Sequence, residues 1–274
     1  MESRSVESNG MSLEYFSFGN GPQVLLCFHG FGRRAEDFFY FREELEKNFT
    51  VYSFNVFHHG KSEYPGDRIE RNTLRPDELK ALISLFLDQH SIERFSLMGY
   101  SMGGKITLML LHLFAERINH MYLLAPDGIV YNQWYRFTSK NRIGNSIYKS
   151  ILRKPGFFFF ILRLLRKTRL ISDKFMRFVM ANLDTRNKRE LVYKVWMTLR
   201  NIDPSPSESS KIIRKLNLPV YLFYGKHDRI IKSSSGKSFA SKAGDSVRFI
   251  EVECGHNLFT PDTKSCLKKV FSIE

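Results

Sequence analysis

Cysteine is scarce in this 274-residue chain, and its scarcity excludes two kinds of architecture. The three cysteines, Cys27, Cys254 and Cys266, are odd in number and form neither a CxxC pair nor a metal-ligand spacing. A disulfide framework needs an even, larger set, and a structural zinc site needs closely spaced ligands. We therefore expect free thiols, a reducing compartment and no metal. A dinucleotide fingerprint is also missing, so we expect no organic cofactor.

Long apolar runs are missing as well. The longest, residues 157–162, is interrupted by Arg163, whereas a membrane-spanning helix needs about 20 apolar residues. Residues 1–20 are polar and lack the apolar core of a secretion signal. We therefore expect a cytoplasmic protein without a membrane span, and peripheral contact with a membrane stays open.

Acidic residues are few in one stretch of the chain. The net charge is +14. Residues 131–217 hold 20 Lys and Arg against 5 Asp and Glu, and the rest of the chain holds 22 Lys and Arg against 23 Asp and Glu. That stretch therefore carries +15 and the remainder −1. Either this stretch is a helical surface exposed to solvent, or its positive electrostatic field attracts an anionic substrate or an anionic lipid surface. No recognised binding motif accompanies the charge, so we expect no specific nucleic-acid partner.

Short apolar runs and amphipathic segments alternate outside this basic stretch. Runs that are apolar on both faces predict strands at residues 23–28, 50–55, 94–98, 120–125, 219–224 and 246–252. Helical spacing of apolar residues predicts helices at residues 35–47, 76–90, 102–116, 234–242 and 263–271. The alternation predicts an α/β fold with a doubly wound, mostly parallel sheet. Residues 131–217 lack strand signals and predict an inserted helical cap, with 1–130 and 218–274 forming the domain that holds the sheet.

The segment Gly99-Tyr100-Ser101-Met102-Gly103-Gly104 lies between a predicted strand and a predicted helix. In this context the G-x-S-x-G pattern predicts a sharp turn that exposes the Ser101 hydroxyl at the carboxyl end of the sheet. Small residues are needed two positions to either side, because a Cβ there would collide with neighbouring backbone. The alternative is a phosphate-binding loop or a plain tight turn.

A nucleophilic serine needs a base, and the base needs an orienting acid. His256 and Asp228 each follow a predicted strand, so both emerge at the same edge of the sheet as Ser101. The chain order Ser, Asp, His is the one that this arrangement uses. Asp127, which follows another strand, is the alternative acid.

The segment His29-Gly30-Phe31-Gly32 follows the first buried strand. Its glycines let the backbone turn, so we expect the amides of Phe31 and Met102 to form an oxyanion hole. The His29 side chain is either buried in the loop or in contact with substrate.

These motifs resemble those of the α/β-hydrolase fold superfamily, in the branch with a helical cap. The matching segments are HGFG at His29, GYSMGG at Gly99, GKHD at Gly225 and GHNLF at Gly255, and they cover about residues 12–271. The stretch from Asn55 to Ser62 resembles the D-x-x-G-x-G-x-S loop of the family, with Asn55 where an Asp is usual. We expect that change to affect loop packing more than chemistry.

The triad predicts a serine hydrolase that cleaves a carboxylic ester through an acyl-enzyme, acting on a small, anionic or lipid-like ester. The resemblance leaves a C–C bond hydrolase or lyase on a small carboxylated substrate as the alternative. The menaquinone-pathway lyase of the superfamily resembles GYSMGG followed by Arg, where this chain has Lys105. Lys105 and Tyr100 are therefore candidate substrate-binding residues, although Lys105 would otherwise face solvent. A non-catalytic binding protein is the second alternative.

The segment 153–167 places phenylalanine and leucine residues between basic clusters. On a helix, Phe158, Ile161, Leu162 and Leu165 would share one face, which must be buried somewhere. Either that face covers the active site, or it lies in a lipid interface with Arg163, Arg166 and Lys167 at the headgroups.

Overall fold

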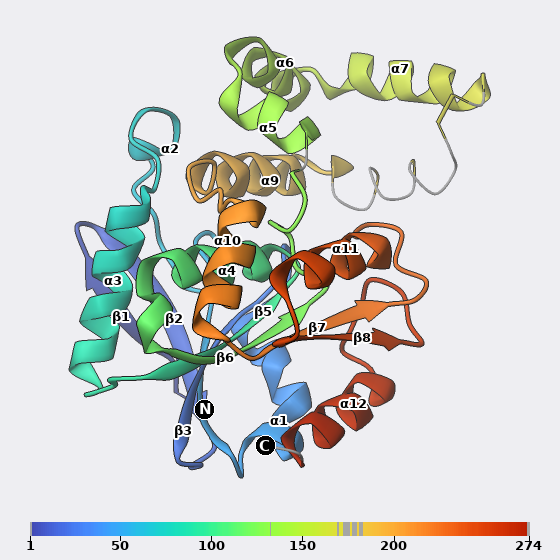
Figure 1. Ribbon diagram of the computed structural model, residues 1–274. Helices are drawn as coiled ribbons and strands as arrows, with labels where there is room; N and C mark the ends of the chain where they lie inside the picture. The colour runs from blue at the N-terminus through green and yellow to red at the C-terminus, as the bar shows by residue number, and fades with distance from the viewer. Residues whose placement is uncertain are drawn as a thin grey trace. The chain divides into compact units, whose positions relative to one another are not determined.

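A single β-sheet forms the centre of the fold. The computed structural model describes residues 2–131, 133–168, 170–171, 176, 180 and 183–272. Within that part of the chain, eight strands form the sheet in the order β1-β2-β4-β3-β5-β6-β7-β8 (Figure 1). The strands are β1 (Arg4–Ser8), β2 (Met11–Phe18), β3 (Gln23–Phe28), β4 (Phe49–Phe54), β5 (Phe95–Tyr100), β6 (Ile118–Leu124), β7 (Val220–Gly225) and β8 (Val247–Val252). Strands β3 to β8 are parallel, and β1 and β2 add an antiparallel edge.

This arrangement confirms the predicted doubly wound α/β sheet, but the sequence analysis missed the hairpin of β1 and β2. Only Val6 of β1 is buried, so the strand carries little apolar signal. The available signal was Asn9-Gly10, because both residues adopt positive φ (52° and 74°) in the turn between the strands. Asn-Gly is the preferred pair for such a hairpin turn.

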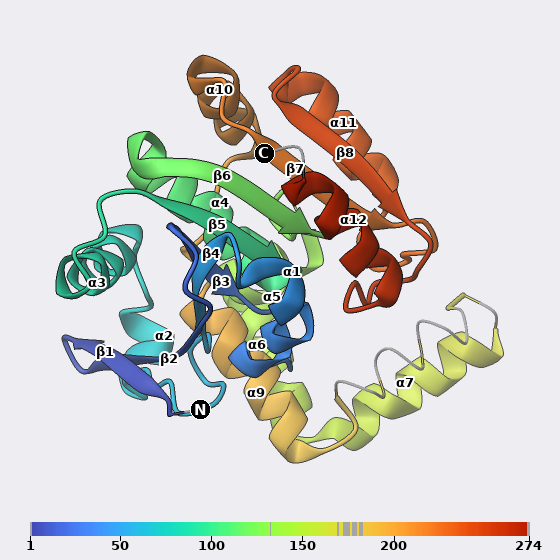
Figure 2. The same ribbon diagram turned by 90° about the horizontal axis from the view of Figure 1, so that it is seen from below.

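Helices cover both faces of the sheet (Figures 1 and 2). One face carries α3 (Pro76–Gln89), α4 (Met102–Phe114), α10 (Pro206–Leu216) and α11 (Ser233–Ala243). The other carries the 3-10 helix η1 (Ala35–Phe41), α1 (Arg42–Leu45) and α12 (Pro261–Phe271). A second 3-10 turn, η2 (Ala115–Arg117), ends α4. Pro76 begins α3, and the Arg75 N–H donates to Glu78 Oε2 (3.0 Å), which caps the start of the helix.

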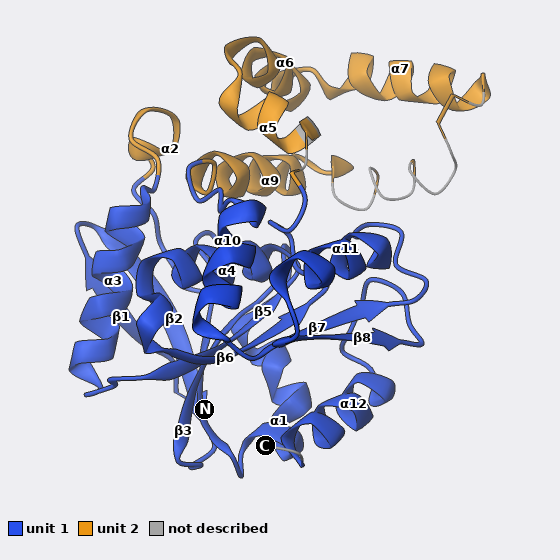
Figure 3. Ribbon diagram, in the orientation of Figure 1, with its two compact units in different colours: residues 1–65, 74–130, 201–274 blue, residues 66–73, 131–200 orange. Residues whose placement is uncertain are grey.

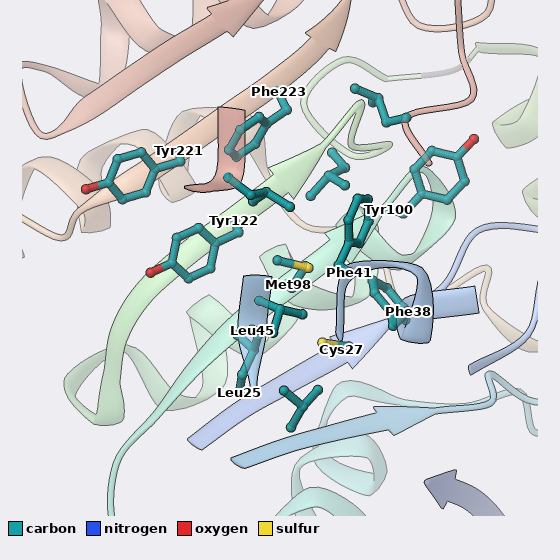
Figure 4. Close-up of a cluster of buried hydrophobic side chains, with 14 of the residues drawn as sticks. Leu25, Cys27, Phe38, Phe41, Leu45, Met98, Tyr100, Tyr122, Tyr221 and Phe223 are labelled. Carbon is teal, nitrogen blue, oxygen red and sulfur yellow. The ribbon is translucent and has the colours of Figure 1, made fainter. Parts of the chain in front are cut away.

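A large apolar cluster lies between the sheet and η1, α1 and α12 (Figure 4). Leu25 and Cys27 are alternate residues of β3 and point into this cluster together. They meet Phe38 and Phe41 of η1, and all four side chains are fully buried. Cys27 is thus a core residue, and burial raises the pKa of its thiol well above the usual range. All three cysteines are free.

The chain divides into two compact units, residues 1–65, 74–130 and 201–274 as unit 1 and residues 66–73 and 131–200 as unit 2 (Figure 3). Unit 2 contains α2 (Arg68–Arg71), α5 (Gln133–Lys140), α6 (Arg142–Arg153), α7 (Pro155–Lys167) and α9 (Arg186–Thr198). The predicted cap, 131–217, shares its first residue with the segment 131–200 of unit 2, but unit 2 ends at residue 200 and also includes residues 66–73. Helix α10 packs on α4 and α11, and His112 and Ser209 are hydrogen-bonded (2.8 Å). The end of the strand pattern does not indicate which layer a helix joins.

Unit 2 has its own small core and polar ties. Tyr148 stacks on Tyr193, with ring centroids 5.6 Å apart, and its ring also lies 5.9 Å from that of Trp196. Glu70 of the short α2 accepts hydrogen bonds from Lys149 Nζ (2.7 Å) and the Tyr193 hydroxyl (3.0 Å), which explains why residues 66–73 belong to this unit. No helix among the described residues is long and apolar enough to cross a bilayer.

Candidate active site

The turn between β5 and α4 holds Ser101 in a strained backbone conformation. Ser101 has φ +50° and ψ −115°, a region that side chains with a Cβ rarely adopt. Its N–H donates to Leu124 O (2.9 Å), and its carbonyl accepts from the N–H groups of Gly104 and Asp127 (2.8 Å each). These hydrogen bonds stabilise the strained backbone conformation that a nucleophile elbow requires.

The glycines beside Ser101 are required because backbone passes close to them. A Cβ at Gly103 would lie 1.8 Å from the carbonyl oxygen of Phe28. A Cβ at Gly99 would lie 2.8 Å from the carbonyl oxygen of Gly103. The first residues of α4 therefore press against the end of β3, which places the loop that follows β3 beside the elbow.

Three side chains from three loops meet at the carboxyl end of the sheet. His256 Nε2 lies 3.0 Å from Ser101 Oγ, and His256 Nδ1 lies 2.7 Å from Asp228 Oδ2. The Asp228 side chain is fully buried, and its Oδ1 accepts from the N–H groups of Ile230 (2.7 Å) and Ile231 (3.0 Å). This network fixes the carboxylate, which then orients Nδ1–H and leaves Nε2 to accept the serine proton.

The loop that carries His256 is held by contacts that the sequence analysis did not predict. Arg33 donates to Asn257 Oδ1 (2.5 Å) and stacks on Phe259, with its guanidinium carbon 4.8 Å from the ring centroid. The Tyr100 hydroxyl donates to the His256 carbonyl oxygen (3.0 Å). The predicted substrate-binding Tyr100 is thus a support for the histidine loop. Burial raises the pKa of its phenol to about 12.

Phe259 belongs to the GHNLF segment, but no sequence signal marks Arg33 as its partner, because these contacts join residues more than 200 positions apart. Gly225 does carry one, as the first residue of the GKHD segment. A Cβ there would lie 2.0 Å from the Gly255 carbonyl oxygen, so only glycine lets the loops of Asp228 and His256 approach each other.

The loop after β3 is fixed by two buried histidines. The Val56 N–H donates to His29 Nε2 (2.9 Å), and His29 Nδ1 lies 2.7 Å from Gly30 O. The Gly32 N–H donates to His59 Nε2 (3.1 Å). Burial lowers the pKa of His29 to about 3 and also lowers that of His59, so both rings are neutral and can accept these hydrogen bonds.

Of the two alternatives for the His29 side chain, burial in the loop or contact with substrate, the structure shows burial in the loop. The side chain is fully buried and both ring nitrogens are occupied by backbone. One candidate oxyanion donor, Phe31, lies in the loop that the two histidines hold, and the other, Met102, lies at the start of α4. Phe31 lies between the histidine-held residues Gly30 and Gly32, and Met102 is the first residue of α4, where backbone N–H groups have no acceptor within the helix.

Asn55 replaces the usual aspartate because Glu14 supplies a carboxylate in its place. Asn55 Oδ1 accepts from the Ala35 N–H (2.8 Å), and its Nδ2 donates to Glu14 Oε2 (2.8 Å). The same Glu14 oxygen accepts from the Lys61 N–H (2.6 Å). Burial alone would raise the pKa of Glu14, but hydrogen bonds from Lys61, Ser3 and Asn55 outweigh it and hold the pKa below its ordinary value.

Asp127, the alternative acid, lies near His256 but is engaged elsewhere. Its Oδ1 accepts from the Gly128 N–H (2.9 Å), whereas Asp228 holds the imidazole. Burial raises the pKa of Asp127, although the Lys105 cation opposes this shift. Lys105 does not face solvent: only 4% of it is exposed. A buried cation therefore lies one helical turn from Ser101, beside Asp127.

An α/β sheet that carries a serine on a strained strand-to-helix turn, with a histidine and an aspartate behind it, defines the class of alpha/beta hydrolases. The profile of the alpha/beta hydrolase fold family matches residues 23–263, so the chain belongs to this family. The match confirms the resemblance that the four motifs indicated.

Known members resemble this chain over different lengths. The dihydrolipoyllysine-residue acetyltransferase component of the acetoin cleaving system of Cupriavidus necator is 27% identical over 123 residues, 45% of this chain and 32% of that protein. The chain thus matches about a third of that relative's length. The 2-hydroxy-6-oxo-6-(2'-aminophenyl)hexa-2,4-dienoic acid hydrolase of Metapseudomonas resinovorans is 24% identical, covering 92% of this chain and 84% of that protein. An esterase structure from Thermogutta terrifontis has a TM-score of 0.67 at 15% identity, covering 100% of this chain and 97% of that chain.

Proposed function

We propose that this hydrolase is a serine hydrolase that cleaves a carboxylic ester through an acyl-enzyme. The observation that carries the proposal is the hydrogen-bonded series from Ser101 Oγ to His256 and from His256 to the buried Asp228 carboxylate. A serine hydroxyl is a weak nucleophile until a neighbouring base takes its proton, and this series supplies the base and its orienting acid.

The reaction follows from these contacts. Ser101 Oγ attacks the ester carbonyl carbon while its proton passes to His256 Nε2. Asp228 stabilises the resulting imidazolium through Nδ1–H. The amides of Phe31 and Met102 donate to the oxyanion of the tetrahedral intermediate, whose collapse releases the alcohol with the proton from His256. Water then attacks the acyl-enzyme by the same proton transfers, and the acid is released.

The alternative is hydrolysis of a C–C bond in a carboxylated substrate. Two observations favour it: the relative from Metapseudomonas resinovorans is named as a dienoic acid hydrolase, and Lys105 places a buried cation close to the elbow. A cation there suits a substrate with a carboxylate. The same triad would serve both reactions, so the substrate decides between them.

A comparison of two substrate types tests the proposal. The purified chain is assayed on 4-nitrophenyl esters from acetate to dodecanoate and on a 6-aryl-2-hydroxy-6-oxohexa-2,4-dienoate, with Ser101→Ala as the control. We expect saturable ester turnover that the control lacks and that exceeds turnover of the dienoate. Faster dienoate cleavage would establish the alternative instead. A folded chain without turnover of either would favour a binding protein.

A further inference from the structure

Helix α7 carries two apolar faces, and among the residues that the structure describes only one of them is packed. Leu162 is buried against Met176, and Phe158 and Phe159 pack on the same small cluster. The sequence analysis placed Ile161 on this face, but Ile161 is 37% exposed. The inner face of α7 is therefore Phe158, Phe159 and Leu162, and it anchors the helix within its own unit.

The other face, here called the outer face, consists of Phe157, Phe160, Ile161 and Leu164. These residues are spaced i, i+3, i+4 and i+7, so they form one continuous stripe along two turns. Their exposed fractions are 71%, 61%, 37% and 52%. A single exposed apolar residue needs no explanation, but four on one helix face mark a surface that binds something.

The charged residues that border the outer face on α7 are all positive. Arg163 follows Phe160 by three positions and Lys167 follows Leu164 by three, so both cations border the stripe. Residues 128–172 contain ten Lys and Arg and neither Asp nor Glu. An apolar stripe whose charged neighbours on α7 are all cations complements a surface that is apolar inside and anionic at its boundary, which describes an anionic lipid bilayer.

The length of the helix determines how it would meet that surface. Helix α7 has 13 residues, which is about 20 Å at 1.5 Å per residue, too short to cross a hydrocarbon core of about 30 Å. We propose that α7 lies in the plane of an anionic membrane surface, with the outer face in the acyl boundary and Arg163 and Lys167, which border that face, at the headgroups. This docking does not depend on the chemistry at Ser101.

Vesicle co-sedimentation tests this proposal with the full chain. Vesicles of phosphatidylcholine with phosphatidylserine are compared with vesicles of phosphatidylcholine alone, at low salt and at about 1 M salt, where the Debye length falls to about 3 Å. We expect binding to the anionic vesicles at low salt, and much weaker binding at high salt or without phosphatidylserine.

Two variants separate the apolar and the charged contributions. Phe157→Ser with Phe160→Ser should weaken binding roughly tenfold for each phenylalanine. Arg163→Gln with Lys167→Gln should weaken it by about fivefold per charge. The matched controls are Ile143→Ser, which removes a 69% exposed apolar residue from α6, and Lys215→Gln with Lys242→Gln, which removes the same charge from unit 1. The controls should bind like the parent chain, and circular dichroism checks that every variant is folded.

Three results would overturn the proposal. The first is an absence of binding to anionic vesicles at low salt. The second is a loss of binding in a control that equals the loss in the matching α7 variant, because the outer face would then not be the docking element. The third is concentration-dependent dimerisation without vesicle binding, abolished by the two phenylalanine substitutions, which would identify a second copy of the chain as the occupant.

Discussion

Burial of His29 predicts a specific loss of stability in acid. The pKa of the His29 ring is lowered from 6.5 to about 3, because the side chain is fully buried. Between these two values the unfolded chain holds a proton that the folded chain lacks. The free energy of unfolding therefore falls by about 1.4 kcal/mol for each unit by which the pH is lowered. The contribution of His29 to the free energy of unfolding is complete above about pH 6.5. It declines towards pH 3, by about 4–5 kcal/mol in total.

Urea unfolding of the parent chain and of His29→Gln measures this loss. Glutamine keeps a donor and an acceptor but has no titratable proton. Between pH 7 and pH 4 the parent should lose about 3 kcal/mol more stability than the variant, whatever the absolute stability of each. Carboxylates and His59 titrate in both proteins, so their contributions cancel in the comparison. Equal pH dependence of the two proteins would refute the argument that a buried, neutral His29 holds the loop after β3.

The remaining predictions concern the two buried acids and the loop at Asn55. Asp228→Asn should lower ester turnover by roughly 10⁴, because an amide cannot hold the imidazole in the required tautomer. Asp127→Asn should reduce it far less, since Asp127 does not bond to His256; steady-state kinetics with both variants would show the reverse order if Asp127 were the acid. Asn55→Asp should lower the free energy of unfolding by about 3 kcal/mol, because two buried carboxylates would then meet without a donor between them. Adding Glu14→Gln restores a donor and should recover most of the loss in urea unfolding, and a doubly substituted chain no more stable than Asn55→Asp would contradict this account of the pair.

The parts of the site that the sequence predicted are those that depend on local geometry. The elbow could be predicted because its pattern, Gly99 to Gly103, is contiguous in the sequence and lies between a strand signal and a helix signal, although the backbone that excludes a Cβ at Gly103 is that of Phe28. Asp228 follows β7, whose apolar pattern is strong, His256 follows the next strand, β8, and parallel strands bring their carboxyl ends to one edge. The order of the motifs then indicated the family.

The missed features depend on contacts between distant segments or on weak patterns. The support of His256 by Arg33 and Tyr100 joins loops that no local pattern relates. The role of His29 follows from Val56, and burial of Lys105 follows from the packing of α4, neither of which spacing alone reveals. Helix α10 was assigned to the cap because its sequence is helical and basic, whereas its buried Ile213 belongs to the layer on the sheet.

Labelling with a fluorophosphonate tests the central claim, that Ser101 is a nucleophile activated by His256 and Asp228. The probe reacts with a serine only when a base removes its proton. We predict one adduct per chain, located on the peptide that contains Ser101 by mass spectrometry. Labelling should be absent in Ser101→Ala and strongly slowed in His256→Ala, with both variants folded. An unlabelled parent chain, or an adduct that persists in Ser101→Ala, would contradict the account.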